Sequence, residues 1–495
     1  MATTIRADSV DKLTGNNFNR WKWQISMVLE AADLLEVVDG TQAPPTDQAD
    51  LKKWKKNDVQ ARSIIGYPAP EGKVLHLLKS IYGLKQSPRC WHEKFSKFLA
   101  NSFGLHKSQH DPSIFIGEIQ NVFVCLILYV DDGLMMSPKK DVLSSLMDGI
   151  QQTFKITKGS PTSYVGLEIT RKGETGPISI TQKKYIVDLL EKYNMSSCKP
   201  ASVPLQPDTE LTPIEPTDDS YPYRQIIGSL LFLAKCSRPD ISVAVSKLAQ
   251  FLNCYGEPHW KAAKGVLRYL RGTTDVGITY QSSGNMQLVA FTDSDFAGCK
   301  ITRRSTSGYV VMLNDSIISW CSQKQPCVTL SSTEAEYVAV TTGAKEVMWL
   351  RSFLKELGHP QEYATDILVD NQSAIRITKN PEMHGRTKHI DVRHHFIRDL
   401  VTNQEVKLEY VPTQDQLADC LTKPLLKGKL HHNRRQLGIS EVEGPSSGRR
   451  QQPTSNNFVR PLSPLMIIGL IAMFIVSASA NAQSPPVLWR KSQFL

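Results

Sequence analysis

Four acidic residues in the second half of the chain have the types and positions to bind a divalent metal ion. Asp293 ends an apolar strand pattern in MQLVAFTDSD, and Asp370 ends another in TDILVDN. Glu336 lies in the first turns of a predicted helix, and Asp419 lies beside Leu417 in a short helical segment. Acids that converge repel one another unless a cation lies between them. Oxygen ligands favour Mg²⁺, with Mn²⁺ as the alternative, and two such ions support phosphodiester hydrolysis. The plainer alternative is four unrelated surface acids.

The elements predicted around these acids form an α/β domain with a mixed sheet. The first strand is followed by a hairpin with its turn at Asn314–Asp315, and then by a long helix that Ser331 or Ser332 caps and Gly358 ends. Two further strands, TDILVDN and KLEYVPT, precede the short helix DQLADCLTK. Glu336 shares the sheet-facing side of the long helix with an apolar stripe, so it needs a partner. The stripe consists of Val340, Gly343, Val347, Leu350, Leu354 and Leu357.

A second pair of acids, Asp131 and Asp132, interrupts the apolar run NVFVCLILYVDDGLMM. The pattern predicts two strands joined by a turn at Asp-Asp-Gly. Two carboxylates at a hairpin tip form an incomplete metal site, because a hard cation takes further oxygen ligands. A third acidic partner is therefore expected elsewhere.

The composition favours a polyanionic partner. The formal net charge is +10 and the pI is about 9.0, which fits nucleic acid first and an anionic membrane surface second. The alternative is that the charge serves solubility only. The nine cysteines include no C-x-x-C pair or zinc-type cluster, and the N-terminus lacks the apolar region of a signal peptide. We therefore expect the cytoplasm or the nucleus.

The apolar segment LMIIGLIAMFIVSASA, residues 465–480, is a candidate membrane anchor. Its length is marginal, because about 20 apolar residues span a bilayer. The alternative is that the segment has no selected role. The polar stretch SSGRRQQPTSNN before it predicts a disordered linker.

Five segments together resemble the ribonuclease H domain of copia-type LTR retrotransposon Pol polyproteins: TDSDFAGC, SSTEAEY, VDNQSAI, RTKHIDVRHHFIRD and TQDQLADCLTK. The resemblance implies cleavage of RNA in RNA–DNA hybrids with two Mg²⁺ ions. Its metal ligands and catalytic residues would be Asp293, Glu336, Asp370 and Asp419. Glu334 is predicted to be a cap or solvent residue. Thr413–Gln414 stands where many cellular ribonucleases H carry a His.

The basic stretch GRTKHIDVRHHFIRD is expected to bind phosphates, with an affinity that depends on salt. Arg386, Lys388 and Arg393 are the candidate cations in this stretch. A zinc site built from its histidines is disfavoured, because no thiolate lies near.

Four more segments resemble the reverse transcriptase of the same elements and the part that follows it: LLKSIYGLKQSPRCW, LYVDDGLMM, YRQIIGSLLFLAKCSRPDI and HWKAAKGVLRYLRGT. This resemblance implies catalytic roles for Asp131 and Asp132 and places Tyr129 near the primer end. The third catalytic Asp of the family comes from an earlier segment resembling DVxxAF. Asp58 in NDVQARSII is superficially similar, but Arg62 replaces the aromatic residue and the flanks predict a helix. We therefore expect the polymerase to lack its first Asp and to be inactive.

The segments KLTGNNFNRWKWQISMVLE and LKKWKKNDVQARSII are similar to the start of copia-type Gag. No zinc knuckle, protease DSG motif or integrase is found in the sequence. The chain therefore resembles an internally deleted element, whose half palm is expected to expose strand edges.

The expected fold is α/β and multidomain, with a partial reverse transcriptase palm and thumb followed by a ribonuclease H-like mixed-sheet domain. The expected boundaries are a Gag-like helical segment at 1–66, the reverse transcriptase portion at 67–198, a linker and helical thumb at 199–280, the ribonuclease H-like domain at 281–427, a disordered linker at 428–460, a candidate transmembrane segment at 461–482 and a tail at 483–495. Two functional alternatives stay open: a non-catalytic nucleic-acid-binding product, and a membrane-tethered one.

Overall fold

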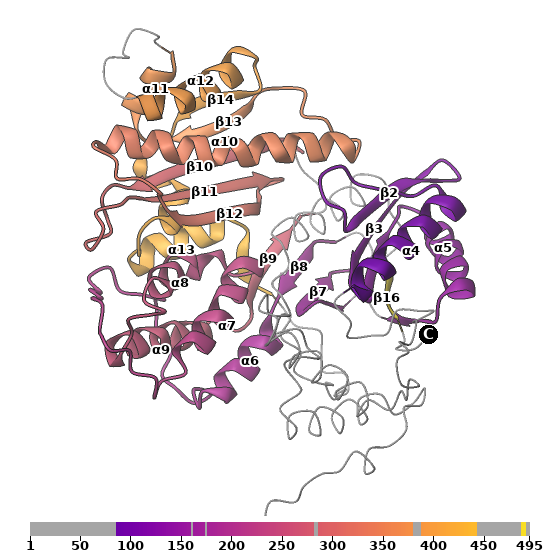
Figure 1. Cartoon of the computed structure of the whole chain (residues 1–495), viewed down its shortest axis with the longest axis horizontal. Helices are drawn as coiled ribbons and strands as arrows, with labels where there is room; N and C mark the ends of the chain where they lie inside the picture. Colours follow the sequence, from indigo (N-terminus) through magenta and orange to yellow (C-terminus); the bar gives the residue numbers. More distant parts are fainter. Residues whose placement is uncertain are drawn as a thin grey trace, which may run out of the picture. The chain divides into compact units, whose positions relative to one another are not determined.

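The structure, a computed structural model, describes residues 86–159, 162–173, 176–281, 286–379, 388–442 and 487–491. Helix α4 (Ser87–Phe103) belongs to one unit of the chain, and Gly104–Lys491 forms the other. Within this second unit the architecture is α/β, with three sheets among the described residues (Figure 1). The predicted Gag-like helices and the apolar segment 465–480 lie outside the described residues. Among the helices that the structure describes, none is long and apolar enough to cross a bilayer.

The first sheet carries Asp131 and Asp132, and its described strands run in the order β1-β2-β3-β4-β16-β5. Their bounds are β1 His106–Lys107, β2 Ile114–Ile119, β3 Val122–Tyr129, β4 Asp132–Met136, β5 Ile156–Gly159 and β16 Val487–Lys491, and helix α5 spans Lys140–Thr153. The turn between β3 and β4 consists of Val130 and Asp131, because Tyr129 pairs with Asp132. The turn therefore lies earlier in the chain than the predicted Asp-Asp-Gly turn, and Gly133 lies inside β4.

The edge of β4 that faces away from β3 is paired, whereas the sequence predicted an exposed edge. β16 runs antiparallel to β4, with Leu488 opposite Leu134. It also runs antiparallel to β5, with Leu488 opposite Gly159. Backbone N–H and C=O groups that a free edge would leave open are thus paired by a distant segment of the same chain.

The second sheet joins three distant parts of the chain in the order β15-β9-β8-β7-β6. Its strands are β6 Ser163–Tyr164, β7 Leu167–Arg171, β8 Ile178–Thr181, β9 Val276–Tyr280 and β15 Ile439–Glu441, and helix α6 spans Lys183–Lys192. β9 pairs with β8, with Ile278 opposite Ile180. The expected boundary at residue 198 therefore falls between two parts of the chain that share a sheet.

The segment from residue 428, predicted to be a disordered linker, begins with regular structure. Helix α13 spans Lys427–Gln436, and β15 follows it directly. Leu430, Leu437 and Ile439 are buried, and Ile439 pairs with Ile278 of β9. Leu430 lies inside a basic and polar run, KGKLHHNRRQ, whose composition does not indicate a packed helix. The predicted linker was therefore wrong for this part.

The helical segment between β8 and β9 is held by a buried ion pair. Its helices are α7 Tyr223–Cys236, η2 Pro239–Ile241, α8 Ser242–Ala249 and α9 Glu257–Arg271. Arg238 donates from Nε to Asp240 Oδ1 at 2.9 Å and from Nη2 to Asp240 Oδ2 at 2.7 Å. Arg238 Nη1 also donates to the Thr273 carbonyl at 2.9 Å, and the Tyr269 hydroxyl donates to Asp240 Oδ2 at 2.7 Å. Arg434 of α13 donates to the Tyr269 hydroxyl at 3.3 Å, so the network also reaches α13.

The third sheet is mixed, as predicted, and its strands run in the order β12-β11-β10-β13-β14. The elements are β10 Leu288–Asp295, β11 Thr306–Leu313, β12 Ser316–Lys324, α10 Ser332–Glu356, β13 Thr365–Val369, α11 Gln372–Lys379, α12 Lys388–Thr402, β14 Val406–Tyr410, η3 Thr413–Asp415 and η4 Leu417–Leu421. β10, β13 and β14 are parallel neighbours, whereas β10, β11 and β12 are antiparallel. The β11–β12 turn lies at Asn314–Asp315, as predicted.

Helix α10 begins and ends where the sequence indicates and packs against this sheet (Figure 1). The Ser331 hydroxyl accepts from the Glu334 amide at 3.2 Å, and Gly358 ends the helix in a left-handed conformation with φ +84°. The predicted apolar stripe is buried. At Gly343 the helix lies so close to β10 that a Cβ would be 2.5 Å from Thr292 Cγ2.

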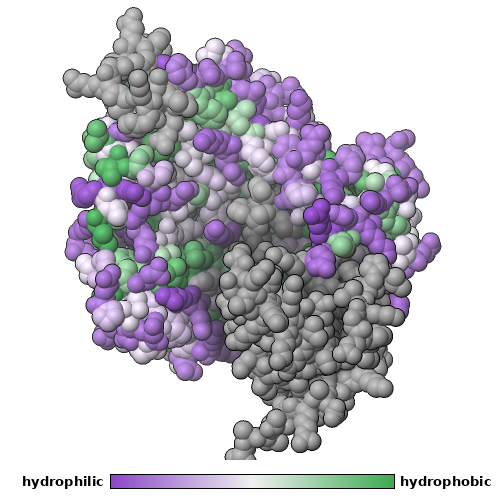
Figure 2. Space-filling view, in the orientation of Figure 1, coloured by the Kyte–Doolittle hydropathy of each residue, from purple (hydrophilic) through white to green (hydrophobic). Residues whose placement is uncertain are grey.

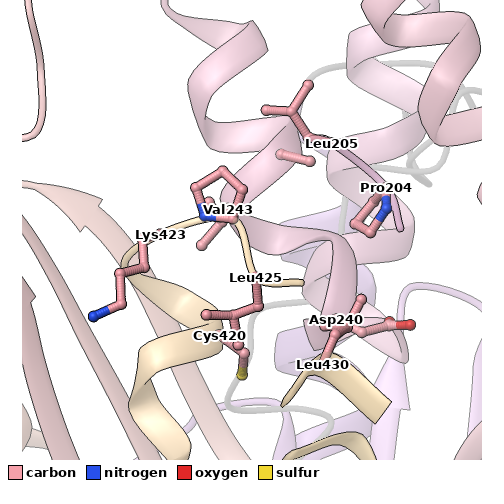
Figure 3. A pocket seen from close by; sticks show the side chains of 10 residues that line it. Pro204, Leu205, Asp240, Val243, Cys420, Lys423, Leu425 and Leu430 are labelled. Atoms are coloured by element: carbon pink, nitrogen blue, oxygen red, sulfur yellow. The ribbon is translucent and has the colours of Figure 1, made fainter. Parts of the chain in front are cut away.

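The viewed face of the described molecule is largely hydrophilic, with small scattered hydrophobic areas (Figure 2). A small pocket lies between the helical segment and the chain around η4 (Figure 3). Its lining includes Pro204, Leu205, Val243, Cys420, Lys423 and Leu430. The loop that follows the third sheet therefore packs on the helical segment as well as on the sheet.

Candidate metal centre

Glu336 enters the site from the first turns of α10, and the sheet fixes its carboxylate. Its Oε1 accepts from the Ser294 amide at 3.2 Å and from the Ser294 hydroxyl at 3.1 Å. The residue is only 5% exposed, and its Oε2 has no hydrogen-bond partner among the described residues. A buried carboxylate oxygen without a partner is costly. A cation bound there would remove that cost.

Asp293 reaches the site from the other face of β10. Thr292 packs against α10 at Gly343, so the next side chain along the strand points away from α10. There the Thr422 hydroxyl donates to Asp293 Oδ2. The chain after η4 approaches β11 at Gly308, where a Cβ would lie 2.7 Å from Thr422 Cγ2. A larger residue at position 308 would push this chain, and with it Thr422, away from Asp293.

Asp370 completes a cluster of three acids. It follows β13, which runs parallel to β10, and the carboxyl ends of parallel neighbours meet at one edge of a sheet. Ligand oxygens of Asp293, Glu336 and Asp370 all lie within 4.8 Å of one another. The Thr413 hydroxyl donates to Asp370 Oδ2 at 2.9 Å. Three converging carboxylates, one with a free oxygen, suit a hard divalent ion such as Mg²⁺ or Mn²⁺.

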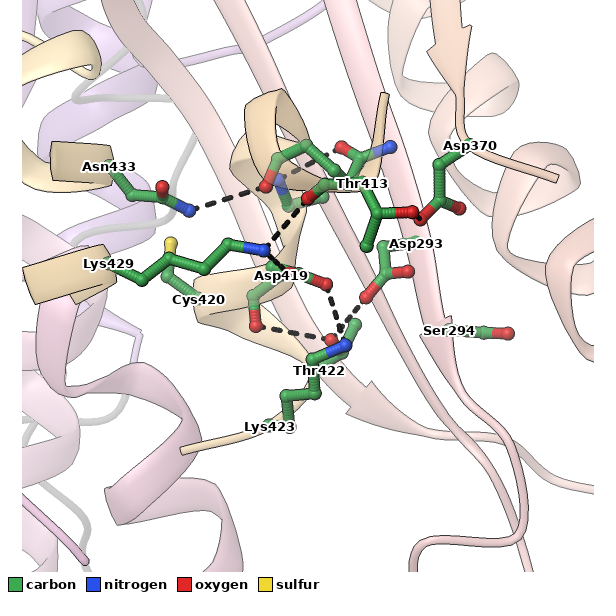
Figure 4. Close-up of polar contacts among 12 residues, drawn as sticks. Asp293, Ser294, Asp370, Thr413, Asp419, Cys420, Thr422, Lys423, Lys429 and Asn433 are labelled. Carbon is green, nitrogen blue, oxygen red and sulfur yellow. Dashed lines mark hydrogen bonds and ion pairs between the residues drawn. The ribbon is translucent and has the colours of Figure 1, made fainter. Parts of the chain in front are cut away.

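Asp419, the fourth predicted ligand, lies near Asp293 but is bound by two lysines (Figure 4). It is fully buried in η4. Lys423 Nζ lies 2.9 Å from Asp419 Oδ1, and Lys429 Nζ donates to Asp419 Oδ2. The structure thus gathers three of the four acids around one position and pairs the fourth with two ammonium groups.

Burial and mutual repulsion favour the protonated forms of two of these acids. Burial raises the pKa of Asp293 above its usual range, and the Asp419 carboxylate raises it further. Burial likewise raises the pKa of Glu336, and the Asp293 and Asp370 carboxylates add to that effect. A bound cation would lower both pKa values again. Raised pKa values are therefore expected of carboxylates that bind a metal ion and are described without it.

Replacing Glu336 with Gln is expected to raise the thermal unfolding midpoint of the metal-free protein. A carboxyl whose pKa rises on folding binds its proton more tightly in the folded state. The free energy of unfolding therefore falls as the pH rises above the unfolded value of 4.5. Because Gln carries no charge, the gain of Glu336→Gln over wild type should grow from about pH 5.5 to about pH 8, reaching about 2–4 °C. Thermal unfolding in EDTA at both pH values measures it.

Glu334→Gln is the matched control, two residues away on the same helix. The Glu334 carboxylate accepts from the Leu330 amide at 2.7 Å, as a cap residue would, so its loss should bring no gain at either pH. Mg²⁺ should raise the wild-type midpoint more at the higher pH than at the lower. A gain for Glu336→Gln that is independent of pH, or that Glu334→Gln shares, would contradict the prediction.

The amino-acid sequence is similar to proteins of retrotransposons. A family model described as reverse transcriptase (RNA-dependent DNA polymerase) matches residues 56–207. The retrovirus-related Pol polyprotein from transposon TNT 1-94 of Nicotiana tabacum is 39% identical over 377 residues, which are 74% of this chain and 28% of that protein. Its counterpart from transposon RE2 of Arabidopsis thaliana is 38% identical over 378 residues, which are 76% of this chain and 26% of that protein. The chain belongs to the copia-type retrotransposon Pol polyproteins.

This Pol chain spans little more than a quarter of the length of these curated relatives, 28% and 26%. Among solved structures, it is similar to the foamy viral protease-reverse transcriptase in complex with an RNA/DNA hybrid, with 11% identity, a TM-score of 0.38 and coverage of 76% of this chain and 42% of that one. It is also similar to the N-terminal RNase H domain of a Mycobacterium tuberculosis protein, with 15% identity, a TM-score of 0.22 and coverage of 30% of this chain and 98% of that one.

The acids predicted for the polymerase site, Asp131 and Asp132, do not belong to the three-acid cluster. Asp131, Asp132 and Tyr129 lie together at the β3–β4 hairpin. In the part of the chain that the structure describes, the only group of three potential metal ligands is the one around Asp293.

Asp58, the weak candidate for the third polymerase acid, lies outside the described residues. The family match begins at residue 56, so it includes Asp58 and starts inside the expected Gag-like segment 1–66.

The structure does not describe the side chains of the residues predicted to bind phosphates in the basic stretch. Arg386 lies outside the described residues. Lys388 and Arg393 belong to the backbone of α12, and their side chains fall outside what the structure describes.

Residues that shape the site but were not predicted come from the chain after β14. Thr413 has no role in the sequence prediction, yet its hydroxyl donates to Asp370 Oδ2. Thr422 and Lys423 are part of the DCLTK motif, so their closeness to Asp419 in sequence was the available signal. Lys429 gave no signal, because it lies in the segment predicted to be disordered.

Proposed function

We propose that this Pol chain is a ribonuclease H that depends on Mg²⁺ or Mn²⁺ and cleaves the RNA strand of RNA–DNA hybrids. The observation that carries the proposal is the cluster of Asp293, Glu336 and Asp370, with ligand oxygens within 4.8 Å of one another and a buried Glu336 oxygen that lacks a partner among the described residues. The reverse transcriptase portion is proposed to be a remnant, a partial palm and thumb without its first catalytic Asp.

Three hydrogen bonds give the acids fixed positions before any ligand binds. Ser294 holds Glu336, Thr422 holds Asp293 and Thr413 holds Asp370. Fixed carboxylates require little rearrangement when a substrate phosphate arrives. Divalent ions held by these acids would activate a water molecule and stabilise the leaving oxygen of the phosphodiester.

The charge of the chain supports a nucleic-acid substrate. A net charge of +10 favours a phosphate backbone, and the basic stretch around α12 is the proposed contact surface. Because cations contacting phosphates release bound counterions, hybrid binding should weaken as the salt concentration rises. Recognition of the RNA strand in addition requires contacts to 2′-hydroxyl groups.

The test is a cleavage assay on a labelled RNA–DNA hybrid, with Mg²⁺ and with EDTA. Cleavage of the RNA strand only in Mg²⁺, with an equivalent DNA duplex left intact, is the expected result. An intact hybrid in both Mg²⁺ and Mn²⁺, at protein concentrations that saturate binding, would refute the proposal.

One observation favours a second candidate, a nucleic-acid-binding product without catalysis. Asp419 is paired with Lys423 and Lys429, so three acids rather than four face the central position. If this pairing persists with substrate bound, the chain should bind hybrids in a salt-dependent way and leave them intact. The same cleavage assay, combined with a binding titration, separates the two candidates.

Template-dependent DNA synthesis is expected to be absent. Two carboxylates at the β3–β4 hairpin hold ions poorly without a third acid. Purified protein with primer, template, Mg²⁺ and dNTPs should therefore not extend the primer. Extension that Asp58→Asn abolishes would contradict this and would identify Asp58 as the third carboxylate.

A further inference from the structure

Two lysines neutralise the acid that should complete the metal site. Asp419 is fully buried, and Lys423 Nζ lies 2.9 Å from its Oδ1. Lys429 of α13 binds the other oxygen, Oδ2. Figure 4 shows both ammonium groups directed at this one carboxylate.

Lys429 is anchored rather than loosely placed. Its ammonium also donates to the Thr413 carbonyl at 2.8 Å, and its side chain is only 29% exposed. Thr413 in turn donates through its hydroxyl to Asp370 Oδ2 at 2.9 Å. The positive charge of Lys429 therefore sits between Asp419 and the residue that orients Asp370.

The other three acids offer a different environment. Asp293, Glu336 and Asp370 present ligand oxygens within 4.8 Å of one another. The Oε2 of Glu336, a residue that is 5% exposed, has no hydrogen-bond partner among the described residues. One divalent ion can therefore bind these three acids while the Asp419–Lys429 contact stays intact.

We propose that Lys429 competes with a second divalent ion for Asp419, so that this chain binds its ions in two steps of unequal affinity. The first ion binds to the three-acid cluster. The second binds tightly only when the ammonium group of Lys429 leaves Asp419, because an ammonium group and a divalent cation at the same carboxylate oxygen repel each other. The inference rests on the proposed function, since it concerns the same metal site.

The test is a Mn²⁺ titration of the full chain without nucleic acid, followed by the EPR signal of free Mn²⁺. Wild type should show one tight site and a second site at least about tenfold weaker. Lys429→Met should tighten the second site by about tenfold or more, whereas Lys429→Arg, which keeps the charge, should leave it weak. Lys427→Met is the matched control, because it removes the same charge from an exposed position of the same helix.

Two results would overturn the inference. One is a second-site affinity in Lys429→Met equal to that in Lys427→Met. The other is two equal sites in wild type, a measurement that does not depend on any variant folding. If wild type cleaves hybrids in either case, the proposed function stands and only the competition is wrong. If wild type shows no Mn²⁺ binding that Asp293→Asn weakens, both fail.

Discussion

Replacing Asp370 with Asn is expected to reduce hybrid cleavage by at least about 10²–10³-fold while hybrid binding is retained. Asn keeps the shape of the side chain and the hydrogen bond from Thr413 but removes one of the three charges that converge within 4.8 Å. A metal-assisted step contributes several kcal/mol of transition-state stabilisation, and about 1.4 kcal/mol corresponds to a factor of ten. Single-turnover cleavage and a fluorescence binding titration on the same hybrid measure the two quantities.

Asp366→Asn is the matched control for this variant. It removes the same charge from the same strand, β13, outside the three-acid cluster, so cleavage should stay within about twofold of wild type. Equal losses of cleavage in both variants would indicate a general charge effect. Cleavage retained by Asp370→Asn would exclude this acid as a metal ligand.

Replacing Arg238 with Ala is expected to destabilise the second unit by about 3–5 kcal/mol, because the change leaves Asp240 buried without its cation. Both side chains of this pair are almost fully buried. Burial alone would raise the pKa of Asp240, yet the guanidinium of Arg238 and the hydroxyl of Tyr269 hold that pKa below its usual range. The midpoint of urea unfolding, followed by tryptophan fluorescence, should therefore fall clearly.

An exposed ion pair on α9 provides the comparison. Lys261 pairs with Glu257 at 2.8 Å, but both side chains are more than half exposed, 72% and 59%. Lys261→Ala should therefore leave the urea midpoint close to that of wild type. Similar shifts for the two variants would mean that the Arg238 network does not stabilise the fold in the way its burial indicates. Arg238→Ala combined with Asp240→Leu should recover part of the loss, because no charge is then left unpaired.

Helix α10 illustrates what local sequence can predict. The Ser331 cap, the buried stripe and Gly358 are all signals within one segment, and each agrees with the others. The position of Glu336 on the buried side followed from helical periodicity alone. Its partner Ser294 did not, because the contact depends on how far α10 slides along β10.

Elements that depend on distant partners were missed. β16 is a short segment whose two neighbours, β4 and β5, precede it by most of the chain, and five residues carry too little pattern to identify a strand. Helix α13 has one apolar residue, Leu430, among basic and polar ones, and the helix packs against η4 and β15. The contact of Lys429 with Asp419 was missed because α13, which carries Lys429, was not predicted as a helix.

The insertion of β16 between β4 and β5 has a consequence for how the protein is made. β4 and β5 leave the ribosome long before Val487–Lys491 does, so the first sheet cannot reach its final strand order until that segment has been made. At about 5–20 residues per second, nascent chains would present the β4 edge to neighbouring polysomes for many seconds.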